Sequence, residues 1–146
     1  MDNWHIDPDQ TLASVNAEIP DINGRINKLL RGLCNKRFSR FSPDEFYLCI
    51  TTGTGLPWTL PLAVKMLQEE PLLEAIAHPG DLFAAVLSVD NSYWHDNPEM
   101  HLAMAKVVEN ALEQAQEMGG ARPLDEILGD DLMAAIMQFH EGLKQQ

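Results

Sequence analysis

Two histidines and two carboxylates lie within seven positions near the middle of the chain, at His95, Asp96, Glu99 and His101. Imidazole and carboxylate groups are ordinary zinc ligands, so a small metal-dependent hydrolase built on these four residues is one hypothesis. Metal ligands must converge, however, and Pro98 is expected to begin a helix, which would leave His95 outside that helix and off the face of Glu99. The specific His-Glu-x-x-His pattern is also absent. A solvated turn is therefore the main interpretation of this segment.

The other chemically suggestive residues have structural explanations. Gly53-Thr54-Gly55 is followed by Leu56-Pro57-Trp58, whereas a phosphate-binding loop needs a Lys-Ser/Thr pair or a third glycine. We therefore expect a helix C-cap and turn there. No serine or cysteine lies in a nucleophile-elbow pattern. Cys34 and Cys49 form no Cys-x-x-Cys pair and are expected to be buried thiols in a reducing compartment. The sequence thus predicts no cofactor, no metal and no enzymatic activity.

Charge is distributed unevenly along the chain. The formal net charge is −12, yet residues 25–40 carry a charge of +6 with no acidic residue, so the rest of the chain carries −18. A surface this acidic repels nucleic acid and anionic lipid and accelerates encounter with a basic partner; simple solubility is the alternative explanation. The basic stretch has few interleaved aromatic residues. We expect it to be a solvated helix face with internal ion pairs, not a nucleic-acid site.

Size and composition indicate one globular domain spanning residues 1–146. This length is typical of a single domain, and 45% apolar with 22% charged residues is ordinary globular composition. The segment Met1–Asp7 is acidic and polar, unlike a signal peptide. No apolar run approaches the roughly 18 residues of a membrane span. The expected location is the cytoplasm.

Apolar residues recur with helical period, which predicts an all-α fold forming a single compact multi-helix domain. One stripe predicts a first helix, and its members are Ile22, Ile26, Leu29, Leu30 and Leu33. A second helix has a complete start signal. Ser42 and Glu45 form a capping box around Pro43, and Phe41 and Phe46 are placed for a hydrophobic staple.

Four further helices are expected. One follows Leu56-Pro57 and ends before Pro71, with Pro61 tolerable only in its first turn. The others run over 81–89, from Asn97-Pro98 to Gly119-Gly120, and from about Asp130 onward. The apolar stripe of the last helix comprises Leu132, Ile136, Phe139 and Leu143.

Several spaced motifs between Thr11-Leu12 and residue 95 together carry a resemblance to a known family. They are Phe41-Ser42-Pro43-Asp44-Glu45, Gly53-Thr54-Gly55-Leu56-Pro57, Leu60-Pro61-Leu62-Ala63, Leu67-Gln68-Glu69-Glu70-Pro71-Leu72, Pro79-Gly80-Asp81-Leu82 and Tyr93-Trp94. Together they resemble a family of bacterial immunity proteins from contact-dependent growth inhibition systems. The sequence departs from the family pattern at Thr54, where a bulkier apolar residue is usual, and at Ala75-Ile76-Ala77-His78, where a polar, tyrosine-containing turn is usual.

The resemblance implies a cytoplasmic antidote that binds the C-terminal toxin domain of a large secreted effector. Such toxins are often nucleases, which are basic because they bind phosphate, and an acidic protein is complementary to them. The shared motifs consist of caps, prolines and glycine turns, so the resemblance supplies no catalytic residue. It also implies that toxin specificity lies in residues outside these motifs.

Seven acidic residues are the predicted toxin contacts, because no apolar stripe needs them and they gather near helix starts. They form two clusters: Asp90, Asp96 and Glu99, and Asp125, Glu126, Asp130 and Asp131. The alternative role is capping of helix N-termini, worth about 1 kcal/mol per site. Trp58 and Trp94 are candidate aromatic anchors of the interface, with burial in the core as the competing interpretation.

Overall fold

The computed structural model of the chain describes residues 6–20, 24–76, 80–120, 122 and 124–144. These residues form no β-strand, and an isolated antiparallel bridge joins Thr11 and Arg37. The all-α prediction is confirmed. The helical elements are α1 (Gly24–Gly32), the 3-10 helix η1 (Phe38–Arg40), α2 (Pro43–Thr52), α3 (Leu56–Glu69), α4 (Asp81–Leu87), α5 (Asn91–Asp96), α6 (Pro98–Gly119), α7 (Leu124–Leu128) and α8 (Asp130–Lys144).

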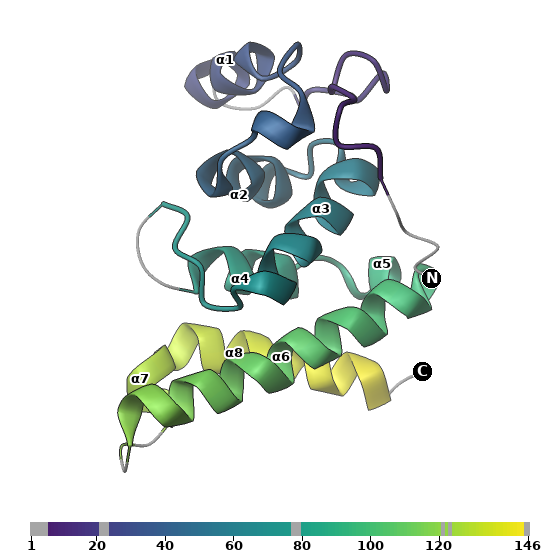
Figure 1. The fold of residues 1–146 in the computed structure, drawn as a ribbon. Coiled ribbons are helices and arrows are strands. Elements are labelled where there is room, and N and C mark those ends of the chain that lie inside the picture. Colours follow the sequence, from purple (N-terminus) through teal and green to yellow (C-terminus); the bar gives the residue numbers. More distant parts are fainter. Residues whose placement is uncertain (1–5, 21–23, 77–79, 121, 123, 145–146) are drawn as a thin grey trace.

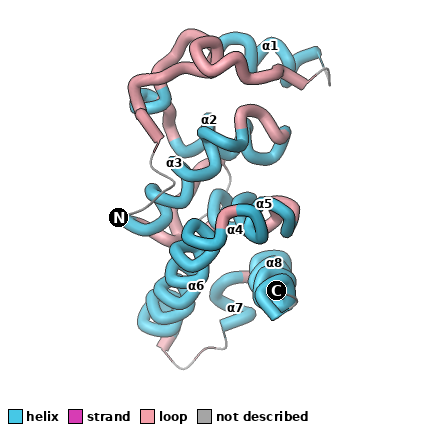
Figure 2. The backbone as a smooth tube through the Cα atoms, turned by 90° about the vertical axis from the view of Figure 1, so that its right-hand side faces the viewer, coloured by secondary structure: helices cyan, strands magenta, loops and turns pink. Residues whose placement is uncertain are grey.

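The helices are stacked in layers from α1 at one end of the molecule to α6 and α8 at the other (Figures 1 and 2). The short helix α4 lies in the middle of this stack and contacts α2, α3 and α8. The long helix α6 contacts α3, α5 and α7. Helix α4 therefore separates α2 from α8, an arrangement that shapes the surface described below.

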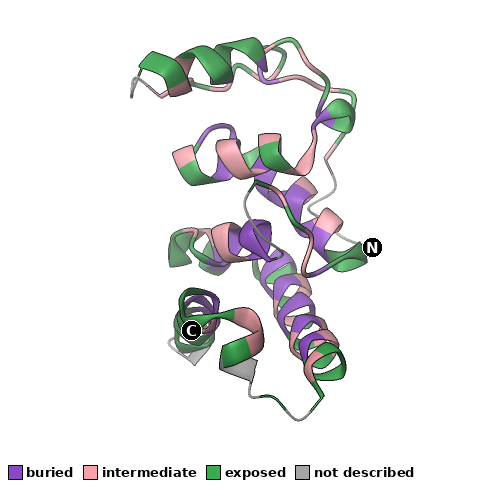
Figure 3. Cartoon of the chain, turned by 90° about the vertical axis from the view of Figure 1, so that its left-hand side faces the viewer, coloured by how far each residue is buried: buried purple, intermediate pink, exposed green. Residues whose placement is uncertain are grey.

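One cluster of buried apolar residues extends through the stack from Leu12 to Phe139. Its bulkiest fully buried side chains are Trp94, Phe38, Phe83 and Phe139. Figure 3 shows buried residues concentrated along the middle helices and on one face of α6, whereas α1 is mostly exposed. The core therefore extends from Leu12, Leu30 and Phe38 at the α1 end of the stack to α8 at the other end.

The predicted start of α2 is confirmed in detail. The Ser42 backbone N–H donates to Glu45 Oε1 at 2.9 Å in the capping box, and the Phe41 and Phe46 ring centroids lie 5.2 Å apart. Lys36 Nζ also reaches Glu45 Oε1 at 2.7 Å. Burial raises the pKa of Glu45, but hydrogen bonds from Lys36 and Ser42 outweigh it, so the pKa lies below its ordinary value.

The two cysteines are free thiols. Cys49 is buried in α2, and burial, with smaller contributions from Glu45 and Cys34, raises the pKa of its thiol to about 12. Because the thiolate is the reactive form, Cys49 is inert at neutral pH. Cys34 is only half-buried, so the prediction of two buried thiols is confirmed for Cys49 alone.

The glycine-rich segment between α2 and α3 is a turn, as predicted. Gly53 adopts φ 75° and Gly55 φ 61°. Thr54 is fully buried between them, and its N–H donates to the Cys49 carbonyl at 2.8 Å. At Gly55 a Cβ would lie 2.7 Å from Leu12 Cδ2, whereas a Cβ at Gly53 would meet no atom within 4 Å. Both positions thus favour glycine because of their backbone conformation, and of the two Gly55 is also required by close packing.

Gly55→Ala is expected to lower the free energy of unfolding by about 2–4 kcal/mol, through left-handed backbone strain plus overpacking against Leu12. Gly53→Ala carries the backbone strain alone and is expected to cost about 1–2 kcal/mol. Urea denaturation of both variants measures the difference. Equal midpoints would show that Leu12 moves aside without cost.

Two sequence predictions about helices were wrong in part. Leu29 is 54% exposed, because α1 lies over the end of the stack and buries Leu30, with Leu33 buried just after the helix; Ile22 lies outside the described residues. Pro61 is the sixth residue of α3, beyond its first turn. The helix continues because its face of Leu60, Ala63, Val64 and Leu67 is buried.

The segment interpreted as a solvated turn contains α5 instead. Asp90 caps this helix, since the Ser92 backbone N–H donates to Asp90 Oδ1 at 2.9 Å. Its residue Trp94 is buried, and so is His101 in α6. Helix α7 was also not predicted, because five residues are too few to show a helical period.

Candidate functional site

The four residues of the metal-site hypothesis do not converge. His95 is exposed at the end of α5, with Nδ1 4.0 Å from Asp96 Oδ1, and Glu99 is exposed in the first turn of α6. His101 instead lies in the core, with its ring centroid 5.0 Å from that of Phe139. Over the described part of the chain, no group of three or more His, Cys, Asp or Glu side chains is arranged to hold a metal ion.

Of the two tryptophans considered as anchors, Trp94 belongs to the core. It is 1% exposed and packs edge-to-face on Phe139 with ring centroids 5.5 Å apart. Burial of this kind excludes Trp94 from a contact surface. Trp58 is half-buried and packs against the core from α3, so part of its ring reaches the surface.

The first predicted acidic cluster is divided by the structure. Asp90 is the N-cap of α5, and its hydrogen bonds from Ser92 hold the pKa of the carboxyl below its ordinary value. Capping of α5 is therefore a sufficient role for the Asp90 carboxylate. Asp96 and Glu99 are exposed at the junction of α5 and α6, on the far side of α5 from its cap.

The second cluster lies around the start of α8. Glu126 is exposed and its Oε2 atom lies 3.8 Å from Arg122 Nε; the side chain of Asp125 is outside the described part of the structure. Asp130 and Asp131 occupy the first turn of α8 and are exposed. No ion pair to either carboxylate is found within the described residues.

Asp130 and Asp131 border an open groove of about 750 Å³ that crosses α4. The α2 residues Tyr47, Ile50 and Thr51 line one side of it, and the α7–α8 junction lines the other. Small side chains on the α4 face leave the space open between these neighbours: Ala84, Ala85 and Ser88. The groove thus forms because α4 carries small residues on its outer face and lies between the longer helices α2 and α8.

A second hollow of about 300 Å³ adjoins the groove, because Ser88 and Val89 line both. Asp90 and Glu141 line this hollow. The structure therefore brings Asp90, from the first cluster, to the same surface as Asp130 and Asp131. Asp96 and Glu99 line neither hollow. Sequence reasoning missed the groove and Tyr47; the small residues of α4 are the only sequence signal for it.

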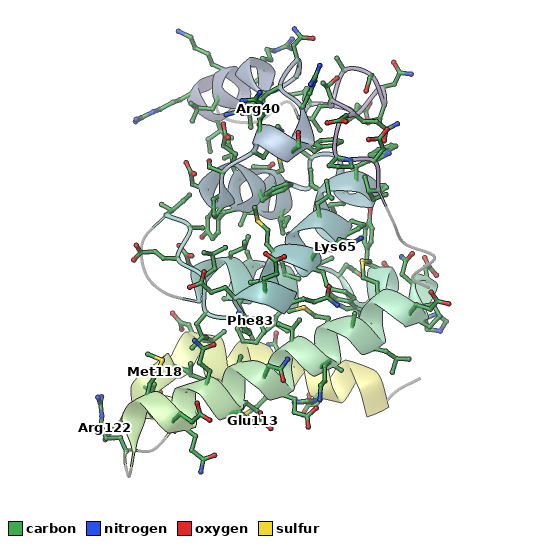
Figure 4. All side chains as sticks on the ribbon, viewed as in Figure 1. Arg40, Lys65, Phe83, Glu113, Met118 and Arg122 are labelled. Carbon is green, nitrogen blue, oxygen red and sulfur yellow. The ribbon has the colours of Figure 1, made fainter. Side chains whose placement is uncertain are left out.

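Six of the ten basic residues lie between positions 25 and 40, around α1 and η1. Figure 4 shows Arg40, the last residue of η1, near α1, Lys65 in the middle of the molecule, and Glu113 and Arg122 at the other end. Lys28, Arg37 and Arg40 are exposed. The predicted internal ion pairs are found for Lys36, which pairs with Glu45, while Arg31 Nε donates to Asn27 Oδ1 at 2.7 Å. Positive charge is thus concentrated at the α1 end, while Lys65 of α3, Lys106 of α6 and Arg122 lie elsewhere.

Comparison of the sequence with known proteins assigns the chain to a family. In the described residues no helix has the length and apolar character needed to cross a membrane. No curated protein and no solved structure gives a significant match to the chain. The family model of CDI immunity proteins, where CDI denotes contact-dependent growth inhibition, matches residues 12–104, which is more than half of the sequence and extends from Leu12 into α6. The predicted family is confirmed, and the chain belongs to the CDI immunity proteins.

Proposed function

We propose that this chain acts in the cytoplasm as an antidote that binds the C-terminal toxin domain of its cognate CDI effector and blocks it by tight, stoichiometric binding. The observation that carries the proposal is the family match over residues 12–104. A non-enzymatic role agrees with the dispersal of the candidate catalytic residues, since His101 is in the core while His95 and Asp96 are on the surface.

We further propose that the toxin is a nuclease with a basic surface. A protein that binds nucleic acid presents lysine and arginine to phosphate. The antidote carries a net charge of −12, with six of its ten cationic residues at positions 25–40 around α1 and η1. The acidic surface outside this basic stretch is complementary to such a toxin and competes with its substrate.

We propose both acidic clusters as toxin contacts. The exposure, position and existing partners of each carboxylate indicate which ones contribute most. Asp130 and Asp131 are exposed, border the groove and have no ion pair in the described residues. Asp90 is engaged as a helix cap, and Glu126 lies beside Arg122. We therefore expect the pair at the start of α8 to contribute most.

Charge reversal tests the clusters in cells that express the toxin domain of the cognate effector. Asp130→Lys/Asp131→Lys is expected to weaken toxin binding by about 10- to 100-fold, because like charges would meet across the interface, and to reduce protection. Asp96→Lys/Glu99→Lys tests the other cluster. Glu113→Lys/Glu117→Lys, on the exposed face of α6, is the matched control.

Circular dichroism and urea denaturation must show that each variant is folded, since reversing charge in the first helical turn costs about 0.3–1 kcal/mol. A folded cluster variant that protects as well as the control removes that cluster from the interface. If the wild-type chain neither binds nor protects against the toxin, the proposed function is wrong.

A further inference from the structure

The groove across α4 has walls of different chemistry. Tyr47 supplies a half-buried aromatic ring on the α2 side, and Asp130 and Asp131 supply two exposed carboxylates on the α8 side. The floor is formed by short side chains such as Ala84 and Ser88. We propose that this groove receives an arginine-bearing segment of the toxin domain, with the aliphatic part of an arginine over the floor and its guanidinium at the α8 carboxylates.

The charge of the groove favours a basic occupant. No described residue that lines it, or that lines the adjoining hollow, is basic, whereas Asp90 and Glu141 add acidic groups beyond Ser88. The third carboxylate of the groove, Asp81, is a structural group. It is 5% exposed, and it accepts the backbone N–H groups of Ala75 and Ile76 at 2.7 Å each. Asp130 and Asp131 are therefore the carboxylates that face an incoming ligand.

Arginine matches this lining better than lysine does. A planar guanidinium donates two parallel hydrogen bonds to carboxylate and also stacks on an aromatic ring. Arginine and tyrosine are among the residues that contribute most to binding at protein interfaces. The cavity volume of about 750 Å³ exceeds what one side chain needs, so it also admits the backbone of the segment that carries the arginine.

The same charge argument disfavours a second copy of this chain as the occupant, because two molecules of net charge −12 repel each other. The residues that line the groove come partly from inside and partly from outside the family match. Helices α2 and α4 lie inside the matched residues 12–104, whereas α8 lies outside them. The floor and the α2 wall thus lie within the family match and the α8 wall lies outside it, as expected if the α8 side selects the toxin.

The inference rests on the proposed function, and its test separates the two. Ser88 is exposed and lines both hollows, so Ser88→Trp fills the groove without changing the charge. We expect this variant, and separately Asp130→Asn/Asp131→Asn, to bind the purified toxin domain at least about tenfold more weakly than wild type. The matched controls on the exposed face of α6 are Gln116→Trp and Glu113→Gln/Glu117→Gln, which are expected to bind like wild type.

A photo-crosslinking residue placed at Ser88 identifies the occupant. We expect crosslinks to a toxin peptide that contains arginine. Binding of both groove variants within about twofold of their controls overturns the groove proposal while leaving the immunity function in place. Crosslinks to a second copy of this chain, to a toxin segment without a basic residue, or to a copurified small molecule also overturn it. Failure of wild type to bind the toxin overturns the immunity function itself.

Discussion

Phe139→Ala is expected to lower the free energy of unfolding by about 3–5 kcal/mol, the range for removing a buried aromatic ring. Phe139 is 1% exposed. Its ring lies against Trp94 of α5 and His101 of α6, with centroid distances of 5.5 and 5.0 Å. Its removal therefore leaves a cavity where α5, α6 and α8 meet, bordered by two large rings that cannot collapse into it fully.

Met137→Ala is the matched control, because Met137 is on the same helix and is 62% exposed. It is expected to change stability by less than about 0.5 kcal/mol. Urea denaturation followed by circular dichroism measures both variants. Because Asp130 and Asp131 lie on the helix that Phe139 anchors, the Phe139 variant should also protect cells less well against the toxin. Equal stability of the two variants would show that α8 is not held to the core by this ring.

The helices that sequence predicted best are those with local signals at their ends. Helix α2 begins at a capping box and ends at a left-handed glycine, and α6 runs from Pro98 to Gly119. Such signals act within a few residues, so they are visible in a single sequence. The resemblance to immunity proteins was likewise carried by these turns and caps, and the family match over residues 12–104 confirms it.

The features that sequence missed depend on contacts between distant segments. His101 is polar and near other potential ligands, yet it is buried because Phe139, 38 positions away, covers it. The groove arises because α2 and α8 rise on either side of the small-residue face of α4. Sequence patterns gave the acidic residues as candidates, but only the structure distinguishes the capped Asp90 from Asp130 and Asp131. The extent of the domain, residues 1–146, stays a prediction.

The second large effect concerns the rate at which antidote and toxin associate. For a basic toxin, long-range attraction to a protein of charge −12 is expected to raise the association rate constant by about 10- to 1,000-fold over its high-salt value. Added salt screens this attraction, with a Debye length of about 30 Å at 0.01 M and 8 Å at 0.15 M. The dissociation rate should change much less, because buried contacts at the centre of an interface govern it.

Because six of the ten basic residues lie at positions 25–40, substitutions there and at the start of α8 should change the association rate differently. Asp130→Asn/Asp131→Asn removes negative charge at the proposed contact surface and should slow association at low salt. Arg37→Gln/Arg40→Gln removes exposed positive charge at the N-cap and the last residue of η1 and should leave association unchanged or accelerate it. Stopped-flow association with the purified toxin domain, over a series of salt concentrations, compares these variants with wild type. If the rate constant of wild type is the same at low and high salt, the acidic surface does not steer the toxin and serves solubility alone.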